Sequence, residues 1–137
     1  MTPNELVKLA LEARKQSYCP YSHFAVGAAL LTKSGKIYQG CNIENVSFTP
    51  IICAERTAFF KAVYDGEREF EAIAVVGAPA DKEPDDFCAP CGVCRQVMRE
   101  FCKDDFKVYL GKEDGTYLEA TLIEMLPFGF SEQNLKG

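Results

Sequence analysis

Residues 71–78, with the sequence EAIAVVGA, are apolar or glycine throughout after the first position. An unbroken run of this kind, rich in β-branched side chains, is typical of a strand that is covered by protein on both faces. The segment FAVGAALLT at 24–32 has the same character. A sheet with two covered faces requires helices on both of them, so the chain is constrained to a layered α/β fold.

The remaining segments supply those helices and the rest of the sheet. Thr2 and Glu5 form a capping-box pattern ahead of an apolar stripe that continues to Gln16, and Thr121 and Glu124 repeat the pattern. We expect helices over 3–16, 53–66, 91–101 and 121–126, and strands over 24–32, 37–45, 71–78, 106–112 and 116–120. This order, α-β-β-α-β-α-β-β-α, predicts a three-layer α/β/α sandwich around a five-stranded mixed sheet, with residues 1–137 as a single domain.

Charge and composition exclude several classes of partner. The net charge is −5 and no Lys/Arg cluster is present, so we expect no nucleic-acid surface. No apolar stretch approaches the roughly 20 residues that span a bilayer, and the charged N-terminus does not resemble a signal peptide. Seven cysteines, an odd number, without an export signal indicate a reducing compartment. We therefore expect a cytoplasmic protein with no membrane partner.

The cysteines of CAPCGVC at 88–94 admit several interpretations. An iron–sulfur cluster of the C-x-x-C-x-x-C-x-x-x-C-P type would need a cysteine where Met98 stands, followed by proline. A thioredoxin-like redox pair of Cys91 and Cys94 is a stronger alternative, because a C-x-x-C at a helix start favours a reactive thiolate. That alternative leaves Cys53 and Glu55 without a role.

A zinc site accounts for more of these residues. Pro90 at the start of a helix lets Cys91 and Cys94 share one face of its first turn, since they are i and i+3. Cys53, at the start of another helix, supplies a third sulfur. Three protein ligands leave the fourth tetrahedral position open for water, which is the mark of a catalytic zinc. His23, the only histidine, lies elsewhere in the chain and is interpreted as a surface or locally bonded residue.

The segment PIICAERTAFF at 50–60 places a carboxylate and a guanidinium beside the first of these sulfurs. Three thiolates and Zn²⁺ leave one surplus negative charge, which weakens the metal as a Lewis acid. Arg56 and the two helix N-termini can offset that charge. Glu55 is placed to handle the protons of an activated water. The combination predicts a hydrolytic zinc site.

The chain resembles the zinc-dependent cytidine deaminases, specifically the small all-cysteine type that acts on free nucleosides. The motifs CPYSHFAVGAAL, GCNIEN, CAERTAF, PCGVCRQ and LPFGF occur in the order of that family and together cover nearly the whole chain. The resemblance implies a cytidine deaminase-like fold and one Zn²⁺ per chain. It assigns the ion to Cys53, Cys91 and Cys94, and the proton shuttle to Glu55.

The resemblance also implies a set of substrate-binding and supporting residues. Asn42 and Glu44 would bind the ribose hydroxyls, and Phe24 would lie against the pyrimidine. In this family the sites lie between the subunits of a homotetramer. Further implied roles are Ala54 in substrate binding, Phe48 and Phe130 in a neighbour's pocket, and Arg56 and Gln96 as donors to the ligand sulfurs.

Each of these assignments has a structural alternative that the sequence leaves open. Phe24 and Phe130 could be core aromatics, Asn42 a turn former, and Glu44 a solvated charge. Cys88 could replace Cys91 as a ligand, although Pro90 and the family pattern favour the later pair.

On the basis of this resemblance we expect the chain to be a deaminase of pyrimidine salvage. It is expected to convert cytidine and deoxycytidine to uridine and deoxyuridine, with release of ammonia, through hydroxide generated at the zinc ion. A thiol oxidoreductase, a structural zinc module with Cys88 as fourth ligand, and a deaminase of a nucleoside antibiotic are the alternatives. The balance between the ribose and deoxyribose substrates is left open.

Overall fold

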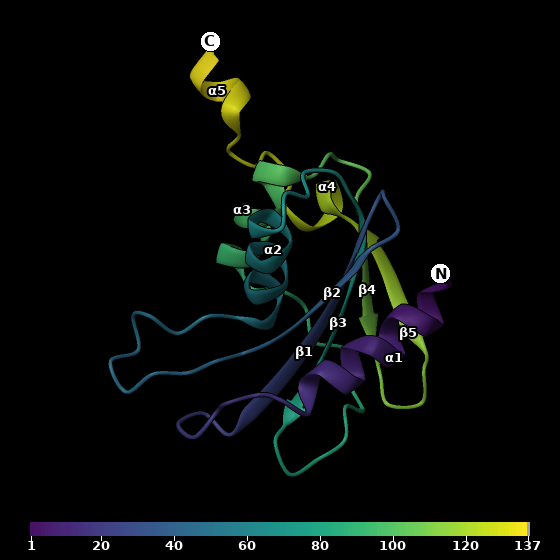
Figure 1. Cartoon of the computed structure of the whole chain (residues 1–137), viewed down its shortest axis with the longest axis vertical. Coiled ribbons are helices and arrows are strands. Elements are labelled where there is room, and N and C mark those ends of the chain that lie inside the picture. Colours follow the sequence, from purple (N-terminus) through teal and green to yellow (C-terminus); the bar gives the residue numbers. More distant parts are fainter. Residues whose placement is uncertain (137) are drawn as a thin grey trace.

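The structure is a computed structural model that describes residues 1–136 (Figure 1). Its elements follow the predicted order with one addition at the C-terminus. They are α1 (Pro3–Arg14), β1 (Phe24–Thr32), β2 (Ile37–Cys41), α2 (Ala54–Tyr64), β3 (Phe70–Pro79), α3 (Gly92–Phe101), β4 (Lys107–Gly111), β5 (Tyr117–Thr121), α4 (Leu122–Met125) and α5 (Glu132–Lys136). Within residues 1–136, no helix combines the length and apolar character needed to cross a bilayer.

The strands form one mixed sheet in the order β2-β1-β3-β4-β5. Neighbouring strands are antiparallel except β3 and β4, which pair in parallel from Ala72 with Lys107 to Val75 with Leu110. The parallel pair is joined through α3, as a crossover connection requires. The predicted five-stranded mixed sheet is confirmed.

Side chains alternate across the two central strands and fill two separate cores. Ala29 and Leu31 of β1 pack with Leu6, Val7 and Ala10 of α1 on one face. On the other face, the neighbouring residues of the same strands pack against α2, α3 and α4; this second core includes Ala28, Leu30, Ala58, Phe59, Ile73, Val75, Met98 and Leu122. Both faces of the sheet are therefore covered, which confirms the three layers and explains why β1 and β3 are apolar at consecutive positions.

The helices on the second face are held close to the sheet at one point by a glycine. A Cβ atom on Gly40 of β2 would lie 2.3 Å from the carbonyl oxygen of Ala54 and 2.7 Å from the backbone nitrogen of Ala58. Any side chain at this position would push away the first turn of α2. Gly40 thus fixes the depth at which α2 begins, and Glu55 lies in that first turn.

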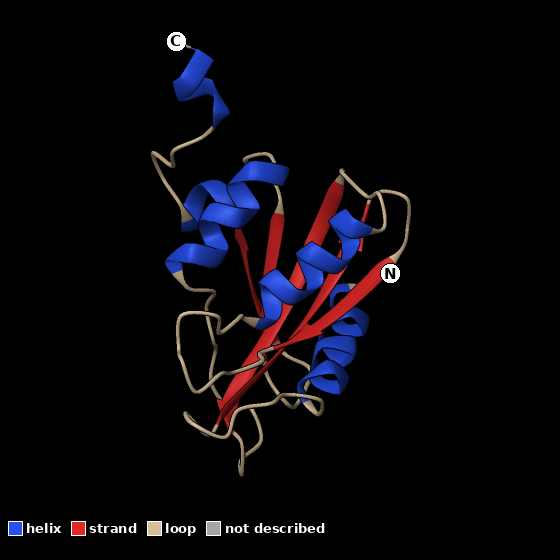
Figure 2. Ribbon diagram, turned by 60° about the vertical axis from the view of Figure 1, so that its left-hand side comes forward, coloured by secondary structure: helices blue, strands red, loops and turns tan. Residues whose placement is uncertain are grey.

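Most element bounds agree with the predictions to within one or two residues, and two differences are larger. The second strand, expected to reach residue 45, ends at Cys41, because the side chain of Asn42 binds neighbouring backbone and the chain then leaves the sheet. Beyond this point, Ile43 forms only isolated bridges, to Tyr18 and Ile52. The predicted order ended with the fourth helix, but the structure adds α5, which extends away from the body of the molecule (Figure 2).

Candidate active site

Three cysteine side chains converge at the N-termini of two helices. Cys53 and Cys91 occupy the N-cap positions of α2 and α3, and both have extended backbones. Cys94 lies in the first turn of α3 and is buried. The Sγ atom of Cys91 lies 3.8 Å from that of Cys53 and 3.5 Å from that of Cys94. Segments far apart in the sequence are thereby joined in one cluster.

The geometry of this cluster fits a zinc ion. All three sulfurs lie within 4.8 Å of one another. Sulfurs bound at ~2.3 Å to a tetrahedral zinc are about 3.8 Å apart, so the observed spacing needs little adjustment. Three protein sulfurs leave one tetrahedral position open, as in catalytic rather than structural zinc sites. The cluster is thus able to bind the metal, and the N-termini of two helices favour the negative charge of its thiolates.

Hydrogen bonds polarise the thiols even without the ion. The pKa of Cys53 is lowered to about 5, first by a hydrogen bond from Cys94 and then by Arg56. The Nη2 atom of Arg56 lies 3.3 Å from the Sγ atom of Cys53. The pKa of Cys94 is raised by the same thiol–thiol bond and by burial. Cys53 therefore carries a negative charge more readily than Cys94 does, and Arg56 is its counter-ion.

Glu55 is the most deeply buried carboxyl group of the site. It lies in the first turn of α2, two residues after Cys53, and only 4% of its surface is exposed. Burial raises the pKa of this carboxyl group to about 7. Since a raised pKa brings the protonated and ionised forms closer in energy at neutral pH, Glu55 has the properties of a general acid and base.

A cavity of about 250 Å³ opens beside Glu55 and the cysteines. It is lined by residues of β1, of the loops that precede α2 and α3, and of the first turn of α2. These residues are Val26, Asn42, Glu44, Ile51, Ile52, Cys53, Ala54, Glu55, Cys88, Ala89 and Cys91. Of the predicted substrate-binding residues, the structure therefore brings Asn42, Glu44 and Ala54 together with Glu55 at one cavity.

Asn42 and Glu44 also organise the chain that precedes β1. The Oδ1 atom of Asn42 accepts hydrogen bonds from Val26 N at 2.9 Å and from the Ser17 hydroxyl, and its Nδ2 atom donates to Phe24 O at 2.8 Å. Both side chains are largely buried, which is unlike the solvated charge considered for Glu44.

Glu44 binds the turn that leads into β1. Its Oε1 atom accepts from the backbone nitrogens of Tyr21 and Ser22, each at 3.0 Å, and its Oε2 atom accepts from the Ser22 hydroxyl. Ser17 and Ser22 were not predicted as residues of the site. Their signal was the hydroxyl pattern in SYCPYS immediately before a buried strand.

Cys88 lines the cavity but does not belong to the sulfur cluster. A Cβ atom on Gly77 of β3 would lie 2.7 Å from the Sγ atom of Cys88 and 3.2 Å from the ring of Phe24. The thiol therefore fills the space that the missing side chain leaves. Burial raises the pKa of Cys88 to about 11, which keeps the thiol protonated. The metal-binding group found among residues 1–136 consists of Cys53, Cys91 and Cys94, without Cys88.

The other predicted residues lie outside the cavity in this single chain. Gln96, expected to donate to a ligand sulfur, donates instead to the carbonyl oxygen of Phe130 at 2.8 Å. Phe48 lies on the loop between β2 and α2, pairs edge-on with Tyr21, and is 64% exposed. Phe130 is 57% exposed, and Phe24 lies at the edge of the cavity, partly exposed. His23 is bonded through its backbone to Cys19 and Ala80.

Comparison with known proteins gives consistent results. Residues 1–110 match the family model described as the cytidine and deoxycytidylate deaminase zinc-binding region. The chain is 50% identical over 135 residues to a cytidine deaminase of Sporosarcina psychrophila, covering 98% of this chain and 96% of the relative. It is 32% identical to a blasticidin-S deaminase of Bacillus cereus over 93% of this chain and 91% of that protein. A crystal structure of a Burkholderia pseudomallei cytidine deaminase matches with a TM-score of 0.87 and 46% identity, covering 95% of this chain and all of that one.

Proposed function

This chain belongs to the zinc-binding cytidine and deoxycytidylate deaminase family, and on that premise we propose that it hydrolyses cytidine and deoxycytidine. The products are uridine or deoxyuridine and ammonia. One observation carries the proposal: three sulfurs with the spacing of a zinc site lie beside a buried carboxyl group at a cavity in the deaminase fold. Hydrolytic removal of an amine needs an activated water and a proton carrier, and this arrangement provides for both.

Cys53, Cys91 and Cys94 would hold the zinc ion. When bound, the ion would supply a Lewis acid that makes water nucleophilic at neutral pH. Arg56, whose guanidinium group donates to the Cys53 sulfur, balances the negative charge of the thiolates.

Glu55 moves the protons. Its carboxylate accepts a proton from the attacking water and delivers it to N3 of the pyrimidine, while the water oxygen bonds to C4. It then carries the second proton of that water, now on the C4 hydroxyl group, to the amino group. The amine leaves as ammonia when the C4–N bond breaks and C4 becomes a carbonyl. The near-complete burial of Glu55 supports this role, because bulk water cannot compete with it as a proton carrier.

Asn42 and Glu44 bind the ribose. Both line the cavity, and both are held in place by bonds to the chain before β1. An amide nitrogen has two hydrogens and a carboxylate has about four acceptor positions, so each side chain can bond a hydroxyl group in addition to these partners. Phe24 and Ala54 contact the base in this proposal.

The enzyme assembles as a homotetramer, with Phe48 and Phe130 completing a neighbour's site. Exposed aromatic groups on two projecting segments support this assembly: the loop before α2 carries Phe48, and the chain before α5 carries Phe130 and Phe128, which is 103% exposed (Figure 1). Large exposed aromatic side chains are typical of protein–protein contacts. Light scattering after size-exclusion chromatography measures the mass, and a monomer with full activity would contradict the assembly.

The protein acts in the cytoplasm, in pyrimidine salvage, and residues 1–137 form one domain. The free state of the seven cysteines supports a reducing compartment. The two cores share one sheet, which supports a single domain.

A cytidine assay tests the proposal directly. Zinc-loaded protein is incubated with cytidine or deoxycytidine, and the loss of cytosine absorbance is followed, with metal-stripped protein as the control. We expect turnover of both nucleosides by the zinc-loaded protein alone. The similarity to a blasticidin-S deaminase makes that antibiotic the second substrate to test. If the protein deaminates the antibiotic but neither cytidine nor deoxycytidine, the proposed function is wrong and the antibiotic is the substrate.

A further inference from the structure

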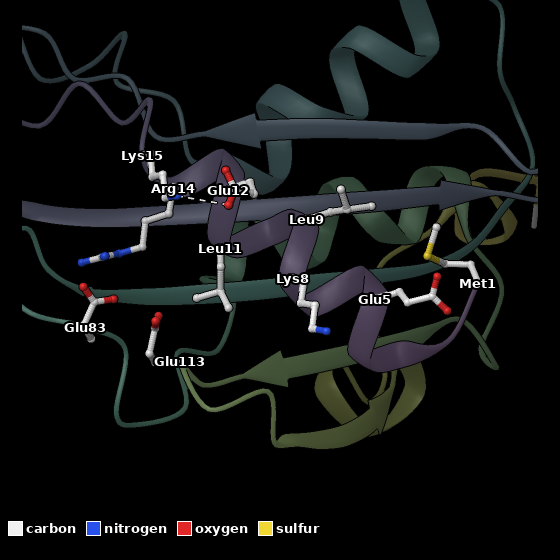
Figure 3. Close-up of a pocket in the computed structure, with 10 residues that line it drawn as sticks. All are labelled: Met1, Glu5, Lys8, Leu9, Leu11, Glu12, Arg14, Lys15, Glu83 and Glu113. Carbon is white, nitrogen blue, oxygen red and sulfur yellow. Dashed lines mark hydrogen bonds and ion pairs between the residues drawn. The ribbon is translucent and has the colours of Figure 1, made fainter.

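Arg14, the last residue of α1, binds the backbone of several separate segments. Its Nε atom donates to Ala25 O at 2.9 Å, and its Nη2 atom lies 3.2 Å from Ala78 O, 2.8 Å from Pro79 O and 2.8 Å from Lys82 O. A guanidinium group is a rigid, planar fork, so it fixes the positions of the carbonyl groups relative to one another. Figure 3 shows the side chain extending away from the end of α1.

The β1 carbonyl that Arg14 binds lies directly behind the cavity wall. Ala25 is flanked by Phe24 and Val26, and Val26 lines the cavity. Side chains alternate across the strand, so α1 meets one face of β1 while Phe24 and Val26 present the other. Asn42 binds the backbone of both of these residues from the cavity side. The strand end is thus bound on one side by a cavity residue and on the other by Arg14.

The other carbonyl groups begin the segment that leads to the zinc ligands. Ala78 follows Gly77, against which Cys88 packs. Residues 79–91 then run from the end of β3 to Cys91. Their course is fixed at later points as well: Pro84 O accepts from Glu113 N at 2.7 Å, and Pro90 O accepts from the Nε atom of Arg95 at 2.8 Å.

The contact between α1 and β1 is unusually close at the point where Arg14 leaves the helix. A Cβ atom on Gly27 would lie 2.1 Å from Ala10 O and 2.5 Å from Arg14 N. The absent side chain lets the last turn of α1 lie directly on the strand. This close approach places the guanidinium group within reach of β1, β3 and the loop together.

We propose that Arg14 is a positioning residue of the active site. From the opposite face of the sheet, it fixes the end of β1 that carries Phe24 and Val26 relative to the segment that carries Cys88 and Cys91. Arg14 does not line the cavity, so it acts through the backbone rather than on substrate. The inference deepens the proposed function and rests on it for the activity measurement, whereas a zinc-release measurement is independent of any substrate.

The test compares two neighbouring basic residues in the zinc-loaded, full-length protein. Arg14→Met removes the fork, and Lys15→Met makes the same change of charge at a side chain whose ion pair is with Glu12 on the same helix. Zinc transfer to a chromogenic chelator and kcat/KM for cytidine are measured at a temperature where circular dichroism shows each variant folded. We expect Arg14→Met to release zinc about 10-fold faster and to lose about 10–100-fold in kcat/KM, with Lys15→Met unchanged.

A conservative variant separates positioning from simple stability. Arg14→Lys keeps the charge but has one nitrogen in place of the planar guanidinium group. Its rate of zinc release and its kcat/KM should therefore lie between the values for wild type and for Arg14→Met. A folded Arg14→Met protein that matches Lys15→Met in zinc release and kcat/KM would overturn the proposal, even if its melting temperature were lower. If Arg14→Met fails to fold, wild-type values for Arg14→Lys would overturn it. If the wild-type protein does not turn over cytidine, the proposed function fails and the zinc-release comparison still decides the role of Arg14.

Discussion

Helix α1 begins in a different way from helices α2 and α3. At the start of α1, Glu5 N donates to the Thr2 hydroxyl and Thr2 N donates to the Glu5 carboxylate, each at 3.2 Å. At the start of α2 and α3, the N-cap residues are Cys53 and Cys91, and neither side chain makes a capping hydrogen bond. A polar N-cap stabilises a helix by about 1 kcal/mol.

The missing caps of α2 and α3 mark the positions where a functional residue stands in place of one that would stabilise the helix. In α4, which carries no predicted site residue, the backbone N–H and the hydroxyl of Thr121 both donate to the Glu124 carboxylate at the helix start. Among α1 to α4, the two helices that start without a hydrogen-bonded threonine–glutamate pair are α2 and α3, which carry the cluster sulfurs. A zinc ion bound to these sulfurs would therefore hold both helix starts in place of a capping hydrogen bond. The usual preference for a polar N-cap residue is not met at the two positions that serve the chemistry.

Removal of a metal ligand should have the largest effect, because α2 and α3, unlike α1, begin at residues that bind the metal. Cys53→Ala, Cys91→Ala and Cys94→Ala should each abolish stoichiometric zinc binding and turnover, because two sulfurs do not hold the ion in an open tetrahedral site. Cys88→Ala is the matched control and should retain one zinc per chain. The measurement is metal content by atomic emission after dialysis. Loss of zinc from Cys88→Ala, with retention in Cys91→Ala, would reassign the ligand.

Removal of the proton carrier should leave the metal and the helix starts in place. Glu55→Gln has nearly the same shape but cannot accept a proton, so kcat should fall on the order of 10²–10⁴-fold while zinc content stays at the wild-type value. Steady-state kinetics with cytidine, together with metal analysis, check this. Near-normal turnover by a zinc-replete variant would remove Glu55 from the mechanism.

A serine in place of Cys91 should supply the capping hydrogen bond that is missing at the start of α3. In the metal-free protein, we expect Cys91→Ser to be more stable than Cys91→Ala by about 1 kcal/mol, because a hydroxyl oxygen caps the helix and a methyl group does not. Urea unfolding of the two metal-free variants gives the difference in free energy of unfolding. Equal midpoints and slopes would mean that the N-cap position of α3 has no need of a polar side chain.

The smallest expected effect is the pH dependence of the α1 cap. Hydrogen bonds from the side chain and backbone of Thr2 lower the pKa of Glu5 from its ordinary value of 4.5. The folded state therefore binds this proton less tightly than the unfolded state does, so the cap stabilises above pH 4.5 and loses its effect as the pH falls through the lowered pKa.

Thermal unfolding of metal-free wild type and Glu5→Gln tests whether the stabilisation from the cap is lost as the pH falls. The melting temperature of wild type should exceed that of the variant at pH 7, and the gap should narrow at pH 3. A gap of the same size at both values would show that the carboxylate charge makes no contribution. The use of metal-free protein keeps the protonation of the zinc ligands out of the comparison.

Local sequence signals predicted much of the fold and the metal cluster. The capping boxes at Thr2 and Thr121 depend on residues three positions apart, and both predicted pairs are present in the structure. Cys91 and Cys94 likewise meet within one helical turn. Signals of this kind are legible in the sequence because the interacting atoms belong to one short segment.

Features that depend on distant segments were not predicted. The packing of Cys88, in the loop before α3, depends on Gly77 in β3, and the partner of Gln96 is the carbonyl group of Phe130, near the C-terminus. The early end of β2 depends on Asn42 binding the chain before and within β1. No periodicity in the sequence encodes such contacts, because they arise only when the sheet is assembled.

The contact of Gly77 with Cys88 and Phe24 at the cavity wall has a consequence for engineering and for divergence among relatives. The three positions share one limited volume, since any side chain at 77 would overlap the thiol at 88 and press on the ring at 24. Substitutions there are expected to be epistatic: an enlargement at one position is tolerated only with a reduction at another. Libraries that aim to change the accepted base should therefore vary the three codons together. In a scan of single positions, an enlarged side chain would be rejected because the compensating smaller side chain is absent.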